Sequence, residues 1–416
     1  MINLGLLRDN PEKIRSLIKR KDPSFNVDEL ISLDTKLRSV RAEVESLRQQ
    51  RNQLAEQAAK TKITDELRTQ SIEIGKAIKQ QEKLLDEVLQ KFNDQYLRCP
   101  NILNDDVPAG DKSANKVVKE VGKKRQFDFE FQHHLEIATK IGWLDFETGA
   151  RLAGSQFAFY KGEGAKVLYA LTMLMLRNNM KYGYQMVLPP YLVNEKSLEV
   201  ASNFPKFKDQ VYAIKDEDLY LLPTAEVPLT NIYRDKIFVD DELPCRLTAW
   251  TSCFRREAGG YGATERGLIR IHQFEKCEIY AFCQPDQAQA EHERMMECAE
   301  NILKMLGLTY RVSLLAAQDC SFPSAKTYDI EVWLPGQECF YEVSSSSNCT
   351  DFQARRGSIR FKKSDMRKPE LVYTLNTSSL AVPRLMVALI ENCQQADGSI
   401  KLPEVLTTEI NRLFGE

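Results

Sequence analysis

The chain has 416 residues, of which 43% are hydrophobic, and this suffices for a large core and for two or three domains. Its formal net charge of -2 excludes a globally basic nucleic-acid binder, so any contact with nucleic acid must come from a local patch. The ten cysteines form no Cys-x-x-Cys pair, and the four histidines assemble no evident metal site or catalytic triad. We therefore expect reduced thiols and no structural zinc.

Two further patterns bear on cellular location. Charged residues recur every few positions from the N-terminus, which is not typical of a signal peptide. The sequence contains no run of about 18 apolar residues, the length needed to cross a membrane. We expect a cytoplasmic protein without a membrane partner.

Residues 28–98 are predicted to form an antiparallel hairpin of two long helices, a coiled-coil arm. Apolar residues with a 3,4 spacing indicate one seam in each helix, and Thr64 is the expected N-cap of the second helix. At a rise of about 1.5 Å per residue the arm would be roughly 50 Å long. The first seam comprises Leu30, Leu33, Leu37, Val40, Val44, Leu47, Arg51, Leu54 and Ala58, and the second comprises Leu67, Ser71, Ile74, Ile78, Gln81, Leu85, Val88 and Phe92.

The outer part of the first helix and the turn, residues 36–62, carry more basic than acidic side chains. Among the basic ones are Lys36, Arg38, Arg41 and Arg48, and the bias extends to Lys62. A basic face on an exposed arm is suited to a phosphate backbone. The residues alone leave open the alternative that the hairpin is a dimerisation rod.

The remainder of the chain is predicted to be an α+β body. Pro, Gly, Asn and Asp punctuate the region before it, so we place an N-terminal domain at 1–110, a linker at 111–126 and the body at 127–416. Strands outnumber helices without regular alternation, which favours a mainly antiparallel sheet with flanking helices. Helices are expected at 165–182, 286–306 and 379–394, and strands at 187–188, 219–222, 247–254, 268–280, 328–333 and 339–343.

Glycine-rich nucleotide signatures are absent from the sequence, so any nucleotide must be held by side chains. Arginine suits this purpose because its planar fork pairs two oxygens. Three stretches carry such chemistry. They are the charged hairpin around "FRREAGGYGATERGLIRIHQFEKCE" (254–278), "ECFYEVSSSSNCTDFQARRG" (338–357), whose acid and hydroxyl groups end a strand and suit Mg²⁺, and "LNTSSLAVPRLMVALIEN" (375–392), where a polar turn opens an apolar helix.

These stretches resemble the class II aminoacyl-tRNA synthetases. The hairpin is similar to motif 2, the stretch around Arg384 to motif 3, and "KYGYQMVLPPYLVN" (181–194) to motif 1, with Pro190 as its proline. "LPTAEVPLTN" (222–231), "EVSSSSNCTDFQARR" (342–356) and the helical arm resemble the seryl-tRNA synthetase family in particular. The resemblance covers essentially the whole chain, with its motifs in order.

The resemblance implies a role for each matching residue. Arg255 would contact the α-phosphate of ATP, Glu257 the adenine amino group and Arg384 the γ-phosphate, and Phe274 would stack on adenine. Catalytic roles fall on Arg255, Arg384 and Glu342, and Mg²⁺ would be held with ATP by Glu342 and Ser345. The implied ATP-binding residues are Arg255, Arg256, Glu257, Ile271, Phe274, Glu342, Val343, Ser344, Ser345 and Arg384; the serine-binding residues are Thr224, Ala225, Glu226, Glu278, Asn376 and Ser378; the tRNA-binding residues are Lys36, Arg38, Arg41 and Arg48.

The implied reaction is the ATP-dependent activation of L-serine to seryl-adenylate, followed by transfer to tRNA(Ser), and to tRNA(Sec) where present, by a homodimer. Two alternatives stay open. One is an amino-acid:carrier-protein ligase, which shares the catalytic body but lacks the arm. The other is a non-catalytic tRNA-binding or coiled-coil scaffold, against which the intact charged residues argue.

Some residues depart from the family pattern, and others have an ordinary structural explanation. Thr377, Ser379 and Pro383 stand where the family often has glycine, so we expect local backbone geometry to differ. "GATERG" (262–267) replaces a commoner Lys-Asp-Thr-Arg-Gly loop. Arg256 is expected to be a solvated charge or a contact to the substrate carboxylate. We expect a structural hydrogen bond for His272.

Overall fold

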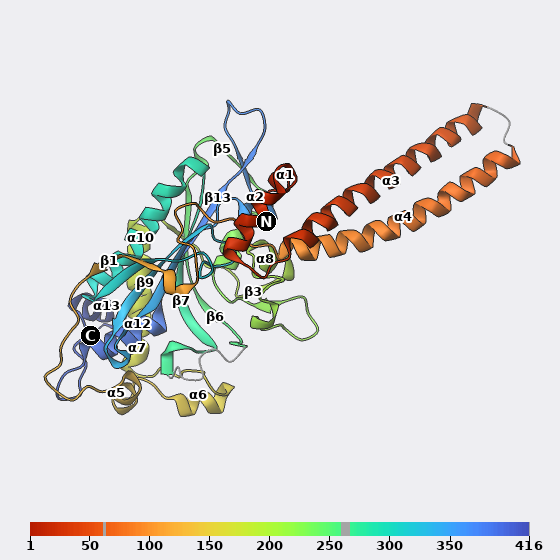
Figure 1. Cartoon of the computed structure of the whole chain (residues 1–416). Helices are drawn as coiled ribbons and strands as arrows, with labels where there is room; N and C mark the ends of the chain where they lie inside the picture. The colour runs from red at the N-terminus through yellow and green to blue at the C-terminus, as the bar shows by residue number, and fades with distance from the viewer. Residues whose placement is uncertain (61–63, 259–266, 416) are drawn as a thin grey trace. The chain divides into compact units, whose positions relative to one another are not determined.

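The computed structural model describes residues 1–60, 64–258 and 267–415. The chain divides into two compact units, Met1–Pro100 and Asn101–Glu416, whose helices and strands are drawn in Figure 1. Within the described ranges, no helix is long and apolar enough to span a membrane. Lys62 and most of the loop "GATERG" lie outside the described residues.

The first unit contains the predicted helical hairpin. Two short helices, α1 (Leu4–Asp9) and α2 (Pro11–Lys21), precede the long helices α3 (Val27–Lys60) and α4 (Asp65–Leu97), which run antiparallel (Figure 1). Thr64 caps α4 as predicted, because its hydroxyl accepts a hydrogen bond from the Leu67 amide at 3.3 Å. The structure thus confirms the arm and the start of its second helix.

The seam of the arm departs from the predicted pattern at Leu33 and Asp34, and the predicted seam residues Arg51 and Ser71 are exposed. Leu37, Val40 and Val44 are buried as expected, but Asp34 is buried in the turn where Leu33 was predicted. Asp34 accepts two hydrogen bonds from the Arg8 guanidinium, at 2.6 and 2.9 Å, and these hold the pKa of its carboxyl below the usual value. A carboxylate is tolerated there because it is paired.

The second unit is built on an eight-stranded sheet with the order β1-β8-β9-β10-β13-β7-β6-β2. Neighbouring strands are antiparallel, except β2 and β6, which are parallel. The predicted α+β fold is therefore confirmed. The strands are β1 (Lys116–Val121), β2 (Gln185–Met186), β6 (Cys245–Phe254), β7 (Gln273–Cys283), β8 (Tyr310–Leu314), β9 (Lys326–Leu334), β10 (Cys339–Asn348) and β13 (Tyr373–Ala381); smaller sheets pair β3 (Leu192–Val193) with β4 (Tyr220–Leu221), and β5 (Ile237–Val239) and β12 (Glu370–Leu371) with β11 (Arg360–Lys362).

The central strand β7 is buried on both faces. Ile279 and Ala281 pack in a cluster with residues of α10, whereas Tyr280 and Phe282 pack on the opposite face with residues of α9. Glu278 shares the face of Tyr280, because side chains two apart point the same way. The helices of this unit are α5 (His134–Lys140), α6 (Phe146–Ala153), α7 (Glu163–Lys181), α8 (Glu195–Val200), α9 (Glu226–Asn231), α10 (Ala288–Met305), α11 (Phe352–Gly357), α12 (Val382–Cys393) and α13 (Glu404–Phe414).

Several predicted boundaries were wrong. Residues 111–126, expected to be a linker, contain the edge strand β1, which pairs with β8. The serine run 344–347 does not follow a strand but continues β10 to Asn348, and the polar stretch 375–381 is strand β13 and not a turn. Strand β7 begins at Gln273 and not at 268. In the first three cases polar side chains lie on a strand, so alternation of apolar residues does not reveal it. In the last case apolar residues before Gln273 belong to a short helical turn, Gly267–Ile269, and the approach to the strand.

Leu37→Ala should loosen the arm. The side chain is 3% exposed in the seam, and its truncation removes buried methyl groups and leaves a cavity, at a cost of about 2–5 kcal/mol. Hydrogen exchange of the α3 and α4 amides in the full chain measures this loss. Lys36→Ala, one residue away and exposed, is the control and should change protection by less than about 0.5 kcal/mol. Unchanged protection in Leu37→Ala would contradict a stabilising seam.

Candidate active site

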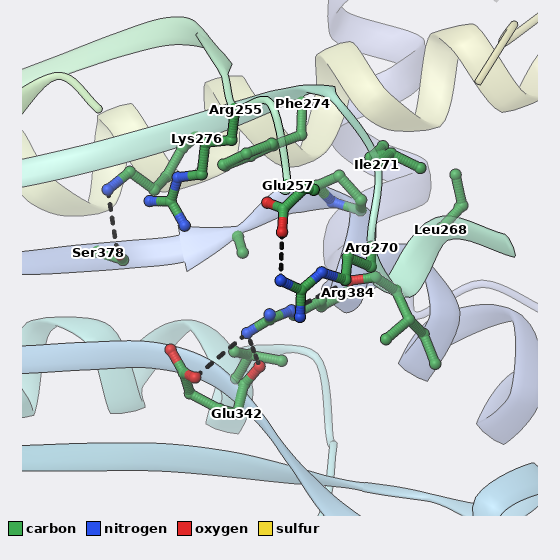
Figure 2. Close-up of a pocket in the computed structure, with 14 residues that line it drawn as sticks. Arg255, Glu257, Leu268, Arg270, Ile271, Phe274, Lys276, Glu342, Ser378 and Arg384 are labelled. Carbon is green, nitrogen blue, oxygen red and sulfur yellow. Dashed lines mark hydrogen bonds and ion pairs between the residues drawn. The ribbon is translucent and has the colours of Figure 1, made fainter. Parts of the chain in front are cut away.

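A pocket of about 200 Å³ lies beside the hairpin of β6 and β7 (Figure 2). The two strands pair from Cys245–Phe282 to Phe254–Gln273, so the chain leaves the sheet at Arg255 and returns to it just after His272. Strands β10 and β13 and the start of α12 complete the wall. The pocket, called the site pocket below, is lined by Arg255, Glu257, Leu268, Ile269, Arg270, Ile271, Phe274, Lys276, Glu342, Val343, Ser378, Ala381, Pro383 and Arg384.

Two predicted phosphate-binding arginines reach the site pocket. Arg255 donates from Nε to the Pro223 carbonyl at 3.2 Å, and its guanidinium lies 5.1 Å from the centroid of the Phe274 ring. Arg384 donates from Nη1 to the Glu342 carbonyl at 2.8 Å and lies 3.4 Å from the Glu342 carboxylate. These contacts fix two permanent positive charges at one pocket.

Arg270 is a third arginine in the site pocket, and it has no counterpart in the sequence prediction. Its Nη2 lies 2.5 Å from Oε2 of Glu257, the residue expected to contact adenine (Figure 2). Glu257 has a φ of 49°, in the left-handed region that non-glycine residues seldom adopt. The position of Arg270, just after the loop of the same hairpin, was the one feature of the sequence that could have indicated this role. The folded loop brings the Arg270 side chain to Glu257.

At the end of the site pocket marked by Ser378, buried polar groups converge on one ammonium group. Lys276 forms an ion pair with Glu278, and its Nζ also donates to Thr224 Oγ1 at 2.8 Å and to Ser378 Oγ at 3.3 Å. The Thr224 hydroxyl donates to Glu278 at 3.3 Å. Thr224, Glu278 and Ser378, which were predicted to bind serine, are therefore brought together. The residue that joins them is Lys276, which the sequence prediction did not include.

Glu226 lies next to this cluster, at the start of α9. Its Oε1 accepts hydrogen bonds from Gln353 at 2.6 Å and Asn376 at 3.2 Å. Burial and the nearby Glu278 carboxylate raise the pKa of Glu226 to about 7, against the opposing effect of Lys276. The predicted residues Glu226 and Asn376 thus contact each other directly.

Other predicted residues lie outside the lining of the site pocket. Ala225 is buried in the core cluster that contains Tyr280. Arg256 is exposed, which agrees with a solvated charge. Ser344 donates its hydroxyl hydrogen bond to the Ser378 carbonyl, and Ser345 lies opposite Asp329 on β9. His272 makes the expected structural hydrogen bond: its Nδ1 is 3.0 Å from the Arg255 carbonyl oxygen.

The three residues that replace family glycines have structural partners here. Thr377 and Ser379 are fully buried; the Thr377 hydroxyl lies 2.6 Å from that of Ser346, and the Ser379 hydroxyl donates to Asn179 at 2.9 Å. Pro383 stands in the first turn of α12, where its missing N–H is not needed. Two of the replacements therefore anchor β13 to its surroundings, and the third is compatible with the start of α12.

A second group of potential metal ligands lies outside the site pocket. Ligand atoms of His133, His134 and Glu391 lie within 4.8 Å of one another. His134 Nδ1 is 2.9 Å from Glu391 Oε1, and the Gly336 amide donates to the other carboxylate oxygen. A metal on Nδ1 would leave a proton on His134 Nε2, which is buried and has no partner within the described part of the chain. The geometry therefore favours a hydrogen-bonded cluster over a metal site.

The four predicted tRNA-binding residues of the arm are all exposed on α3. Arg38 pairs with Asp34 at 3.2 Å, and Arg48 pairs with Glu82 at 2.7 Å. The Arg48–Glu82 pair joins two exposed side chains and is therefore weak, whereas Arg38 pairs with a buried carboxylate. Lys36 and Arg41 are the members of the set without an ion pair to another described residue.

Comparisons with known proteins give matches along the chain that agree with one another. The model of the seryl-tRNA synthetase N-terminal domain matches residues 1–103, and that of the class II tRNA synthetase core domain (G, H, P, S and T) matches residues 207–393. A serine–tRNA ligase from Desulfotalea psychrophila is 44% identical over the whole of both chains. One from Thermodesulfovibrio yellowstonii is 42% identical over 98% of each chain.

Solved structures show the same likeness. The seryl-tRNA synthetase of Pyrococcus horikoshii, complexed with ATP, is 34% identical and superposes with a TM-score of 0.90 over 99% of this chain and 98% of that one. The cytoplasmic enzyme of Naegleria fowleri, in complex with AMP, is 26% identical, with a TM-score of 0.84 over 99% and 97% of the two chains.

Thr377→Val should destabilise the second unit. The substitution keeps the shape of the side chain but leaves the buried Ser346 hydroxyl without its neighbour, which costs about 1–3 kcal/mol. Thermal unfolding followed by circular dichroism measures the change. Thr408→Val, the same substitution at an exposed position of α13, is the matched control. Equal midpoints for the two variants would show that the hydroxyl pair contributes nothing.

Proposed function

This chain belongs to the seryl-tRNA synthetase family, and we propose that it activates L-serine with ATP and transfers the seryl group to tRNA(Ser). One observation carries the proposal: the site pocket joins three arginines to the buried cluster of Thr224, Glu278 and Ser378. A triphosphate needs the first set, and a small hydroxy amino acid needs the second. Nearly the whole chain is similar to a seryl-tRNA synthetase structure complexed with ATP, and this similarity supports a site for both ATP and serine.

In the proposed first step, a serine carboxylate oxygen bonds to the α-phosphorus of ATP while the bond to pyrophosphate breaks. Arg255 stabilises the charge that develops at the α-phosphate, and Arg270 and Arg384 hold the outer phosphates. Phe274 offers a flat face for adenine beside Arg255. Positioning and fixed charge suffice for this chemistry, because no proton must be removed from the carboxylate.

The residues around Glu342 suit a Mg²⁺ ion that accompanies ATP. The Glu342 side chain is 44% exposed at the site pocket. Asp329 lies across from Ser345, and its Oδ1 is buried without a hydrogen-bond partner among the described residues. Burial and the nearby Glu342 carboxylate raise the Asp329 pKa well above its usual value, and a bound cation would oppose this shift. Glu342 and Ser345 would hold the ion, which neutralises phosphate charge when bound.

Serine would be selected at the cluster end of the site pocket. Glu278 is 1% exposed, so a substrate without a hydroxyl would leave unpaired the buried acceptor positions of its carboxylate that Lys276 and Thr224 do not use. We propose that Glu278 and Ser378 contact the substrate, and that Glu226 and Asn376 hold the adjoining wall through their hydrogen bond.

In the proposed second step, a terminal ribose hydroxyl of the tRNA attacks the acyl carbon and AMP leaves. The exposed basic residues of α3 would grip the tRNA backbone. We further propose that tRNA(Sec) is an acceptor where it is present, that the protein is a homodimer, and that it acts in the cytoplasm.

Pyrophosphate exchange with each of the twenty amino acids tests the activity. We expect exchange with serine, and discrimination against alanine by about 10⁴-fold, since alanine leaves the buried polar groups unpaired. Charging assays with tRNA(Ser) and with a carrier protein then separate the synthetase from the carrier-protein ligase. Absence of exchange with every amino acid would instead favour a scaffold.

Arg255→Lys should reduce the rate of serine-dependent exchange by about 10²-fold or more. The lysine keeps the charge but lacks the fork that pairs two phosphate oxygens. Arg256→Lys, the same change at the neighbouring exposed residue, is the control and should exchange within about threefold of the unaltered chain. Loss of activity in both variants alike would contradict the distinction drawn between the two arginines.

Lys36→Gln combined with Arg41→Gln should weaken tRNA binding and flatten its salt dependence. Each phosphate contact that is lost means that about one counterion fewer is released on binding. The magnitude of the slope of log K against log salt should therefore decrease by up to about two. Filter binding at several salt concentrations measures this, and pyrophosphate exchange should be unaffected. Lys83→Gln combined with Lys91→Gln, which removes equal charge from α4, is the control. Equal slopes for both double variants would place the tRNA elsewhere.

A further inference from the structure

Lys276 occupies an unusual place for a cation. It lies on the central strand β7, only 6% exposed, and its side chain enters the site pocket (Figure 2). Every polar partner that the structure gives its Nζ belongs to the proposed serine site: the Glu278 carboxylate and the hydroxyls of Thr224 and Ser378. No role on the substrate side has been assigned to it above.

The hydrogen bonds of Thr224 show what the lysine does to the cluster. A hydroxyl has one proton to donate and two lone pairs to accept with. Thr224 Oγ1 accepts from Lys276 at 2.8 Å and from the Glu226 amide at 3.2 Å, and it donates to Glu278 at 3.3 Å. The hydroxyl is saturated, so Thr224 orients Glu278 and leaves the carboxylate as the acceptor for a substrate.

The charges of the cluster lead to the same conclusion. Two carboxylates, Glu226 and Glu278, face one ammonium group in a mostly buried space, and Arg255 is directed to the phosphate end of the pocket. Without Lys276, two carboxylates this close would share a proton at neutral pH, as like charges in a low dielectric do. Burial and the Glu278 carboxylate raise the pKa of Glu226 to about 7 even though Lys276 opposes this shift.

We propose that Lys276 is the positioning residue that sets the charge of the serine site: it aims Glu278 and offsets one of the two carboxylates, so that the site presents one net negative charge to the ammonium group of the substrate. This inference rests on the proposed function and adds a residue to it. Lys276 acts through Glu278 and Thr224 and does not itself contact the reacting atoms.

The test is the pH dependence of the serine KM in pyrophosphate exchange, measured from pH 6 to 8.5 for the unaltered chain and for Lys276→Met. In the variant the raised carboxyl pKa makes the carboxylate form decline as pH falls. The serine KM should therefore rise by about tenfold or more at pH 6.5 and recover toward pH 8.5. The KM for ATP, measured at saturating serine, should stay within about twofold at each pH, because the arginines are unchanged.

A charge-balancing variant separates this role from a structural one. Adding Glu226→Gln to Lys276→Met restores a single negative charge, so the double variant should regain a low serine KM at pH 6.5. Glu226→Gln alone should not lower the serine KM of the unaltered chain. Such non-additivity is the signature of coupled charges. Lys276→Arg, which retains the charge, should keep the pH profile of the unaltered chain.

Three outcomes would overturn the inference. They are a serine KM that is raised equally at every pH in Lys276→Met, additive effects of the two substitutions in the double variant, and a serine KM in Lys276→Arg that rises at low pH as expected for Lys276→Met. The Lys276→Arg variant keeps the test decisive if Lys276→Met does not fold. Failure of the proposed function is a separate result, because the unaltered chain would then show no serine-dependent exchange at all.

Discussion

The pairing of β13 between β7 and β10 is the constraint on which the site depends. It sets Ser378 opposite Glu278 on one side and Thr377 opposite Ser346 on the other. Two pairings in this part of the sheet are irregular beside a site residue: the β13–β7 register shifts between Ser378 and Leu380, and the β10–β9 register shifts between Glu342 and Ser344. Such bulges re-aim side chains. They lie where one polar group must face the pocket while the next enters the core.

The sheet can hold these polar groups only because each has a partner. Thr377 and Ser379 point away from the site pocket and bond to Ser346 and Asn179. Asn179 in turn donates to Thr248, whose hydroxyl donates to the Glu278 carbonyl at 2.9 Å. A chain of buried hydrogen bonds thus runs behind the strand that carries Glu278. A satisfied network of this kind rigidifies its surroundings, which a site built on fixed charges requires.

The sequence was sufficient for the architecture and for the residues whose types are chemically distinctive. The 3,4 repeat predicts the arm, and the arginines and acids of the hairpin mark the pocket because charge is rare on a central strand. The second half of β10 and the polar stretch of β13 were not recognised as strands, since hydroxyl residues are typical of turns and their strand neighbours are far away in sequence. Asp34 was missed for a related reason: its burial depends on Arg8, which no local repeat reveals.

Lys276 escaped prediction because its role depends on tertiary contacts with Thr224 and Ser378, and Arg270 because the fold of the loop brings it to Glu257. The ion pairs of these two cations with carboxylates show how a site for oppositely charged substrates stays stable before they arrive. Each permanent cation rests against a carboxylate or a carbonyl, so neither sign of charge is left buried alone. A phosphate can take over the arginine that Glu257 now holds, and an ammonium group can share the carboxylate that Lys276 now holds. Substrate binding at such a site would exchange or share partners of like charge, so that no buried charge is left without a counter-charge.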